Sequence, residues 1–139
     1  MDTNNICFFS NYPDNSMDSN SFCAYIETAN NKAGLLRQLD KKLQFPSYFG
    51  YNWDALYELF SDFWWIKQKN ISIYHQGVRS IPFKDLNIYV KILVDICHIW
   101  NKYPEHDVCF FFNEEDRNII TSIINKIGRE NQRIGGGSS

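Results

Sequence analysis

The chain has 139 residues and a formal net charge of −2, a length that suits one domain with its own hydrophobic core. The charge argues against general binding of nucleic acid or of an anionic membrane surface, because both need a basic face. Aromatic residues make up 17% of the sequence. We do not expect all of them to be interior, so some are expected on an interaction surface.

Two short strands are expected near the N-terminus. The first is Ile6–Phe9, and a turn-rich polar connection from Asn11 to Ser21 leads to the second, Phe22–Ile26. The residues after Met1 do not form a signal peptide, and no stretch has the ~18 apolar residues that span a bilayer. We therefore expect a cytoplasmic protein whose four cysteines are reduced.

The first helix is predicted over Lys32–Leu43. Asn30 or Asn31 can cap its start, and Pro46 prevents it from continuing far beyond its last residue. Its apolar residues are spaced as one stripe that faces the core, and they are Leu35, Leu36, Leu39 and Leu43.

The second helix is predicted from Trp53 to Trp64. Asn52 is a suitable N-cap, and Asp54 in the first turn suits the positive end of the helix dipole. Gly50, in the preceding loop, is expected to permit a turn with positive φ or the close approach of another chain. The core-facing stripe of this helix consists of Leu56, Leu59, Phe60 and Phe63.

The same helix carries an acidic face. Asp54, Glu58 and Asp62 are spaced four residues apart, and like charges at this spacing disfavour a helix by ~0.2–0.5 kcal/mol per pair. Many acidic rows are only solvated faces. Here, however, aromatic residues flank the carboxylates and the loop Tyr48–Asn52 leads into them. Because aromatics anchor interfaces and acids select a basic partner, the pattern favours a protein-docking surface.

The remaining elements suggest an α/β protein. Ile71–His75 alternates as a strand does, a long and broadly apolar helix runs from Phe83 or Asp85 to about Asn101, and Val108–Phe112 reads as a buried strand. Strands separated by helices predict a small, mostly parallel sheet with helices packed over it.

A final helix is predicted over Asp116–Ile127. Its regularly spaced isoleucines face the core, and Gly128 is expected to end it. The glycine- and serine-rich end of the chain leads us to expect a flexible tail or linker over residues 129–139. The single folded domain is then residues 1–128.

The loop and second helix resemble the signature motif of the barstar family. Tyr57 stands at the aromatic place of the motif, and Glu58 stands where the family usually has aspartate. The element order is similar from about residue 22 to about residue 112. The resemblance implies a barstar-like sheet with three core strands, a possible extra N-terminal strand and an additional C-terminal helix. The residues that match the motif are Pro46, Tyr48, Gly50, Asn52, Asp54, Ala55 and Leu56.

The resemblance also implies a function. Barstar-like proteins are inhibitors and not enzymes, and their loop and helix plug the basic active site of a ribonuclease. The expected partner is therefore a cognate protein toxin, an endoribonuclease above all, in a 1:1 complex without direct contact with nucleic acid or membrane. Asp62 is expected nearer the rim of the interface than the other acids. The expected partner-binding residues are Tyr48, Phe49, Gly50, Asn52, Trp53, Asp54, Tyr57, Glu58, Ser61 and Asp62.

Several alternatives stay open. The chain could be an immunity protein against a toxin that is not a ribonuclease, or a subunit of a larger complex that uses its aromatic surface. It could also be an enzyme with Asp54 and Glu58 as an acid/base pair, although both carboxylates would project from one side of a helix and not across a cleft. No cofactor is expected. A zinc site near His106 and Cys109 is not expected either, because the sequence has no Cys-x-x-Cys pair.

Overall fold

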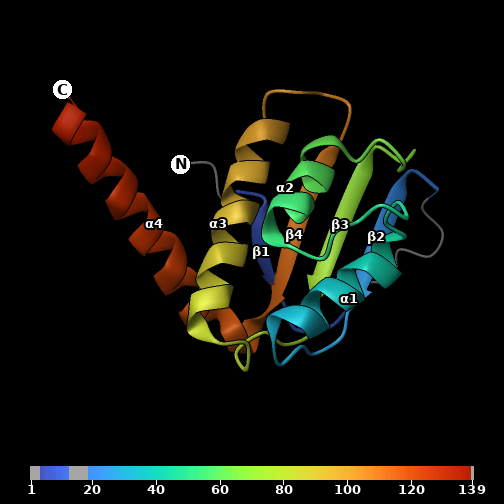
Figure 1. The fold of residues 1–139 in the computed structure, drawn as a ribbon, viewed down its shortest axis with the longest axis horizontal. Coiled ribbons are helices and arrows are strands. Elements are labelled where there is room, and N and C mark those ends of the chain that lie inside the picture. The colour runs from blue at the N-terminus through green and yellow to red at the C-terminus, as the bar shows by residue number, and fades with distance from the viewer. Residues whose placement is uncertain (1–3, 13–18, 139) are drawn as a thin grey trace.

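The computed structural model describes residues 4–12 and 19–138, with side chains described up to Asn131. Residues 13–18 of the predicted polar connection lie outside the described residues. The elements in chain order are β1 (Ile6–Phe9), β2 (Ser21–Ile26), α1 (Lys32–Leu43), α2 (Trp53–Asp62), β3 (Asn70–His75), α3 (Phe83–Trp100), β4 (Asp107–Asn113), the short 3-10 helix η1 (Glu114–Asp116) and α4 (Arg117–Ser138). Figure 1 shows their arrangement.

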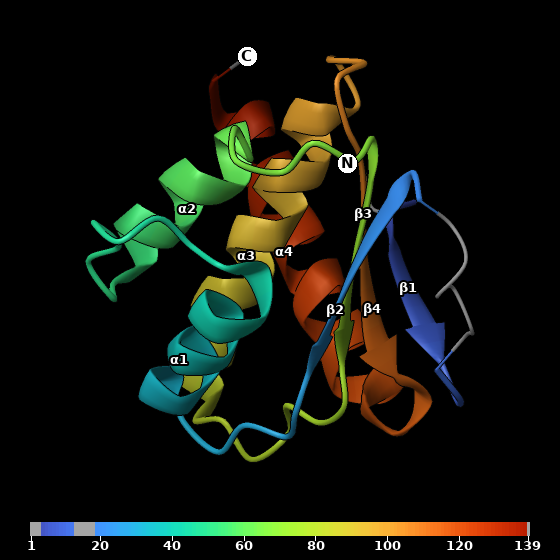
Figure 2. The same ribbon diagram turned by 90° about the vertical axis from the view of Figure 1, so that its right-hand side faces the viewer.

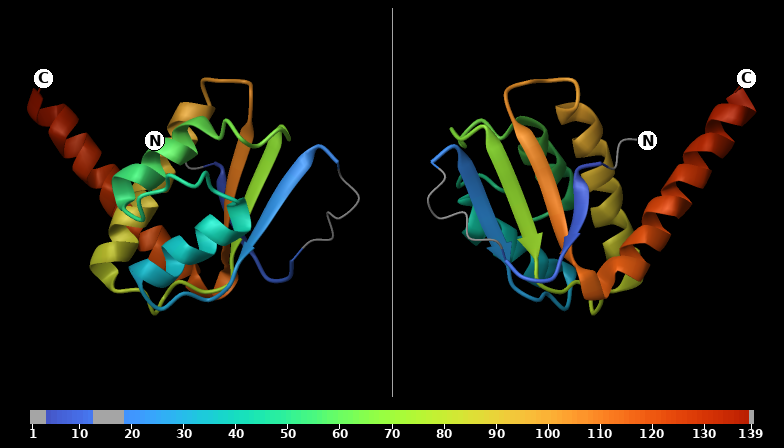
Figure 3. Two further views of the ribbon diagram at one scale, coloured as in Figure 1. Left: turned by 45° about the vertical axis from the view of Figure 1, so that its right-hand side comes forward. Right: turned by 180° about the vertical axis from the view of Figure 1, so that it is seen from behind.

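The four strands form one parallel sheet in the order β1-β4-β3-β2. The helices pack on one face of this sheet, which Figure 2 shows close to edge-on. The predicted α/β fold with an additional C-terminal helix is therefore confirmed. The extra N-terminal strand β1 pairs with β4, with Ile6 opposite Phe110, so the two N-terminal strands lie at opposite edges of the sheet (Figure 3).

Asparagine caps begin the first two helices, as predicted. The side-chain oxygen of Asn31 accepts a hydrogen bond from the backbone N–H of Gly34 (2.7 Å), and that of Asn52 accepts one from Ala55 (2.8 Å). The end of α2 differs from the prediction, because Phe63 turns the backbone left-handed at φ 49°. This turn buries the Phe63 ring completely and takes Trp64 out of the helix.

The core lies between the sheet and the helices. The leucine stripe of α1, the apolar stripe of α2 and the broad apolar face of α3 are all buried there, as predicted from their spacing. Two tryptophans join elements of the helical layer to one another by donating indole N–H groups to helix carbonyls. Trp100 donates to Phe60 (2.9 Å), and Trp65 donates to Leu43 (2.8 Å).

The prediction that Gly128 ends the last helix is wrong, because α4 continues to Ser138. In the described part of the chain no glycine has a positive φ, so Gly128 keeps a helical backbone, at a cost of about 1 kcal/mol relative to alanine. Ile120, Ile123 and Ile127 are buried, and the later turns extend away from the body (Figure 1). The division into a domain and a tail at residue 128 stays a prediction.

Within the described residues, no helix combines the length and the apolar character that crossing a bilayer requires.

Candidate docking site

Two buried phenylalanines attach the loop between α1 and α2 to the hydrophobic core. Phe45 and Phe49 are both buried, and their ring centres lie 4.7 Å apart. A tight turn closes between them, in which the N–H of Phe49 donates to the carbonyl of Pro46 (3.1 Å). Phe49 was expected to contact a partner, but its side chain is only 7% exposed. It supports the loop from the core side, and Tyr48, 67% exposed, is presented to solvent instead.

Tyr51 adopts the left-handed backbone that was expected at Gly50. Its φ is 52°, whereas no described glycine has a positive φ, and such a conformation costs a non-glycine residue roughly 1–2 kcal/mol. The hydroxyl of Tyr51 donates a short hydrogen bond to the carboxylate of Asp40 on α1, which holds the loop against that helix and raises the pKa of Tyr51.

The lack of a side chain at Gly50 has a different role. A Cβ at this position would lie 3.1 Å from the side-chain nitrogen of Asn52, which donates to the Gly50 carbonyl (3.2 Å) while the Asn52 oxygen caps α2. The glycine therefore makes room for the cap residue of α2.

The acidic face of α2 is open to solvent. Asp54, Glu58 and Asp62 are exposed, and among the described residues none of the three takes part in an ion pair. Tyr57, 36% exposed, lies on the same helix. Ser61 is half-buried and its hydroxyl donates to the carbonyl of Tyr57 (2.7 Å), so its polar group is already used within the helix.

A groove separates the loop from the second half of α2. It has a volume of about 310 Å³, and its lining includes the carboxylates of Glu58 and Asp62. Three aromatic residues also line it, the exposed Tyr48 and Trp64 and the buried Phe49. The indole N–H of Trp64 donates to the hydroxyl of Tyr48 (3.1 Å). Trp64 was not among the predicted site residues. Asp54 does not line the groove, so the structure groups Glu58 with Asp62 and not with Asp54.

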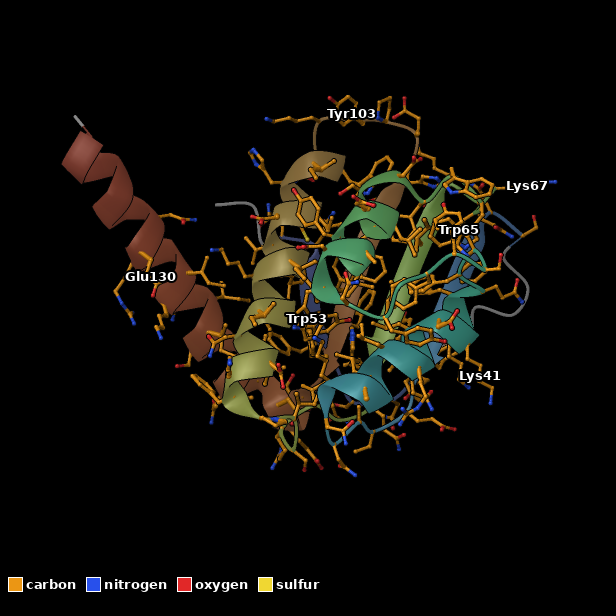
Figure 4. The ribbon with its side chains drawn as sticks, in the orientation of Figure 1. Lys41, Trp53, Trp65, Lys67, Tyr103 and Glu130 are labelled. Atoms are coloured by element: carbon orange, nitrogen blue, oxygen red, sulfur yellow. The ribbon has the colours of Figure 1, made fainter. Side chains whose placement is uncertain are left out.

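A second cavity lies on the other side of the loop. It has a volume of about 440 Å³ and lies between α1 and Tyr51, with Lys32 and Arg37 in its lining. Trp53, at the start of α2, is half-buried, and Nζ of Lys32 lies 5.3 Å from the centre of its ring. Figure 4 shows Trp53 beside the first turns of α1. These cations were not predicted as site residues, because only the folded loop brings Tyr51 and Trp53 next to them.

Two other chemistries find little support in the geometry. Asp54 and Glu58 project from one helix and do not share a groove, which is not the arrangement of two carboxylates across a substrate. In the described ranges, no three potential metal ligands come together. His106 directs Nδ1 at the carbonyl of Gln68 (2.8 Å).

The sequence matches the model of a known protein family. Residues 21–124 match the family described as Barstar (barnase inhibitor). The match includes the loop, α2 and the three strands β2, β3 and β4, and it leaves β1 and the later turns of α4 outside. A search of curated proteins found no match to the chain.

Proposed function

The chain belongs to the barstar family, and from this premise we propose that it inhibits a cognate protein toxin by covering the active site of that toxin. The toxin class that fits best is an endoribonuclease. The docking surface comprises the loop Tyr48–Asn52, the helix α2 and Trp64. The observation that carries this proposal is the open acidic row on α2, which has no cationic partner among the described residues and is flanked by exposed aromatic rings.

Electrostatics explain why such a surface suits a ribonuclease. An enzyme that binds RNA phosphates has a basic active site, and carboxylates can occupy the places of those phosphates. Charge complementarity speeds association and aligns the docked helix, and inhibition by occlusion needs no chemistry from the inhibitor. Tyr48 and Trp64, 67% and 60% exposed, supply rigid apolar area of the kind that anchors interfaces.

The side chains in this surface have two roles. Those expected to touch the toxin are Tyr48, Asp54, Tyr57, Glu58, Asp62 and Trp64, with the backbone of Gly50 and the edge of Asn52. Phe49, Trp53 and Ser61 are more buried and are expected to hold the contact residues in place. A stable 1:1 complex would bury roughly 800 Å² of this chain.

A direct test is inhibition by purified protein. Candidate toxins encoded near this protein are purified, and RNA cleavage is measured with increasing amounts of the chain. We expect inhibition that is complete at one equivalent, is lost in Glu58→Lys and is kept in Glu105→Lys, which reverses an exposed glutamate in the connection before β4. Full inhibition by Glu58→Lys would contradict the proposed docking face.

A second candidate function is immunity against a basic toxin that is not a ribonuclease. It is favoured by Glu58, whose side chain is one methylene longer than the aspartate usual in the family and stands in the groove. The same inhibition experiment with purified toxins distinguishes the two candidate functions. A bound toxin that leaves RNA intact and has another activity, blocked by the chain, supports this second function.

A further inference from the structure

The loop of the docking surface separates two cavities that differ in charge. On the α2 side lies the groove with the carboxylates of Glu58 and Asp62. On the α1 side lies the larger cavity with Lys32 and Arg37, whose remaining walls are Ala33, Leu36 and Tyr51. A partner that covers the loop from Tyr48 to Asn52 therefore meets negative charge on one side and positive charge on the other.

The two cations are available to a partner. Arg37 is exposed and Lys32 is half-buried, and neither forms an ion pair with any residue that the structure describes. The carboxylate of Asp40, also on α1, accepts the hydrogen bond of Tyr51. The ring of Trp53 holds the ammonium group of Lys32 at the edge of the docking surface.

The walls of the cavity indicate the size and chemistry of an occupant. A volume of about 440 Å³ holds a side chain, and the exposed Ala33 offers apolar contact to its methylene groups. A nucleic-acid backbone does not fit this surface, because the three acids of α2 would repel its phosphates. A protein partner with a basic cleft and one carboxylate next to it matches both charges. The basic cleft faces the groove with Glu58 and Asp62, and the carboxylate faces the cavity with Lys32 and Arg37.

We propose that the cavity between α1 and Tyr51 binds an aspartate or glutamate side chain of the protein toxin, and that Lys32 and Arg37 pair with its carboxylate. This inference rests on the proposed function and adds a feature of the partner, an acidic residue beside its basic active site. Charges of opposite sign on the two sides of one loop fix the rotation of the docked toxin, since a rotated toxin would bring like charges together.

The first test uses the toxin recovered in the inhibition experiment. Binding is measured for Lys32→Gln, Arg37→Gln and the matched control Lys41→Gln, whose lysine is exposed near the other end of α1 (Figure 4). We expect each cavity variant to weaken binding about tenfold, mostly through faster dissociation. The control should change it by less than about twofold. Lys32→Gln should not weaken α1, because a cation in the first turn is unfavourable to the helix dipole.

Equal affinities for the parent, the two cavity variants and the control would overturn the inference while leaving the proposed function intact. If the parent protein binds no toxin, the proposed function fails, and a second measurement still decides whether the cavity binds a carboxylate.

The second measurement uses N-acetyl-glutamate amide as a probe, with the indole N–H signal of Trp53 followed by NMR at constant ionic strength. We expect a saturable shift with this probe and none with N-acetyl-glutamine amide. The shift should disappear in the double variant Lys32→Gln/Arg37→Gln. No shift in the parent protein, or a shift with inorganic phosphate alone, would overturn the inference.

Discussion

The indole N–H of Trp64 donates a hydrogen bond to the hydroxyl of Tyr48, across 3.1 Å. The two residues line opposite sides of the acidic groove. Tyr48 lies in the loop before α2, and Trp64 lies just after that helix. Both rings are mostly exposed. The bond therefore fixes the width of the groove at its rim before any partner arrives, which reduces the ordering cost of binding.

Replacing Trp64 by phenylalanine should weaken toxin binding more than it weakens the fold. The ring stays but the N–H is lost, and an exposed hydrogen bond contributes only about 0.5 kcal/mol to the free energy of unfolding. We expect faster dissociation from the toxin with an almost unchanged urea midpoint. Tyr103→Ala, which removes an exposed ring from the connection before β4 (Figure 4), should leave both quantities unchanged. A dissociation rate equal to that of the parent would contradict a role for Trp64 in docking.

The acids of α2 should differ in their effects on binding. Glu58→Gln and Asp62→Asn remove charges from the groove and should each cost ~2–5 kcal/mol of binding free energy, because the facing cation is left buried and unpaired. That range includes measurements on the barnase–barstar pair itself. Asp54→Asn, outside the groove, should mainly lower the association rate and its salt dependence. Kinetics at two ionic strengths check this order, which revises the sequence-based expectation that Asp62 lies nearer the rim.

The stability of the fold should depend on pH through His75. This side chain is fully buried, with Nδ1 2.9 Å from the carbonyl oxygen of Phe111 and Nε2 2.6 Å from the hydroxyl of Tyr89. Burial lowers the pKa of His75 to about 4, although the Phe111 carbonyl and the charge of Asp116 act in the opposite direction.

In the unfolded chain the pKa of a histidine is about 6.5. Between pH 4 and pH 6.5, His75 is therefore protonated in the unfolded state but neutral in the native state. The contribution of the neutral, buried His75 to the free energy of unfolding is therefore fully present above pH 6.5. As the pH falls to 4, the free energy of unfolding decreases by roughly 3 kcal/mol. Urea unfolding between pH 4 and pH 6.5 should show this slope of unfolding free energy against pH in the parent protein. The same slope is expected in the control His98→Gln, whose histidine is exposed. The slope should be much smaller in His75→Gln, and an unchanged slope there would assign it to other groups.

Asp116 should matter far more to stability than its neighbour Glu115. Its carboxylate is buried and accepts hydrogen bonds from the backbone N–H of Val78 (3.0 Å) and from Nε of Arg79 (2.9 Å). Asp116→Ala leaves the buried N–H of Val78 without a partner, which should cost ~1–3 kcal/mol.

Glu115→Ala is the matched control. Its carboxylate lies 4.0 Å from the same arginine but is 82% exposed, so removing it should cost ~0–1 kcal/mol. Urea unfolding of the two variants compares them directly, and equal losses would contradict the structural role of Asp116.

Local signals were sufficient to predict the helices. The leucine spacing of α1 and the capping side chains of Asn31 and Asn52 are properties of a few neighbouring residues, and the structure confirms them. Gly128 shows the limit of such signals. A glycine is compatible with a helix end, but it is also tolerated within a helix at a small cost, and the sequence alone cannot decide between the two.

The positions of the candidate site residues could be predicted where they follow a helical period. They could not be predicted where they depend on tertiary packing. The acids of α2 could be placed because their spacing fixes their common face. Loop residues have no such period, so the buried position of Phe49 could not be read from its neighbours. Trp64 was missed because the left-handed turn at Phe63 takes it out of the predicted helix and towards Tyr48.

The pairing of β1 with β4 also sets the order in which the chain can fold. During synthesis β1 emerges before its partner strand, which follows only after β2, β3 and three helices have been made. The sheet therefore cannot be completed before β4 has been made. Its β1–β4 pair joins segments that are far apart in the chain, and a long-range closure of this kind is slow.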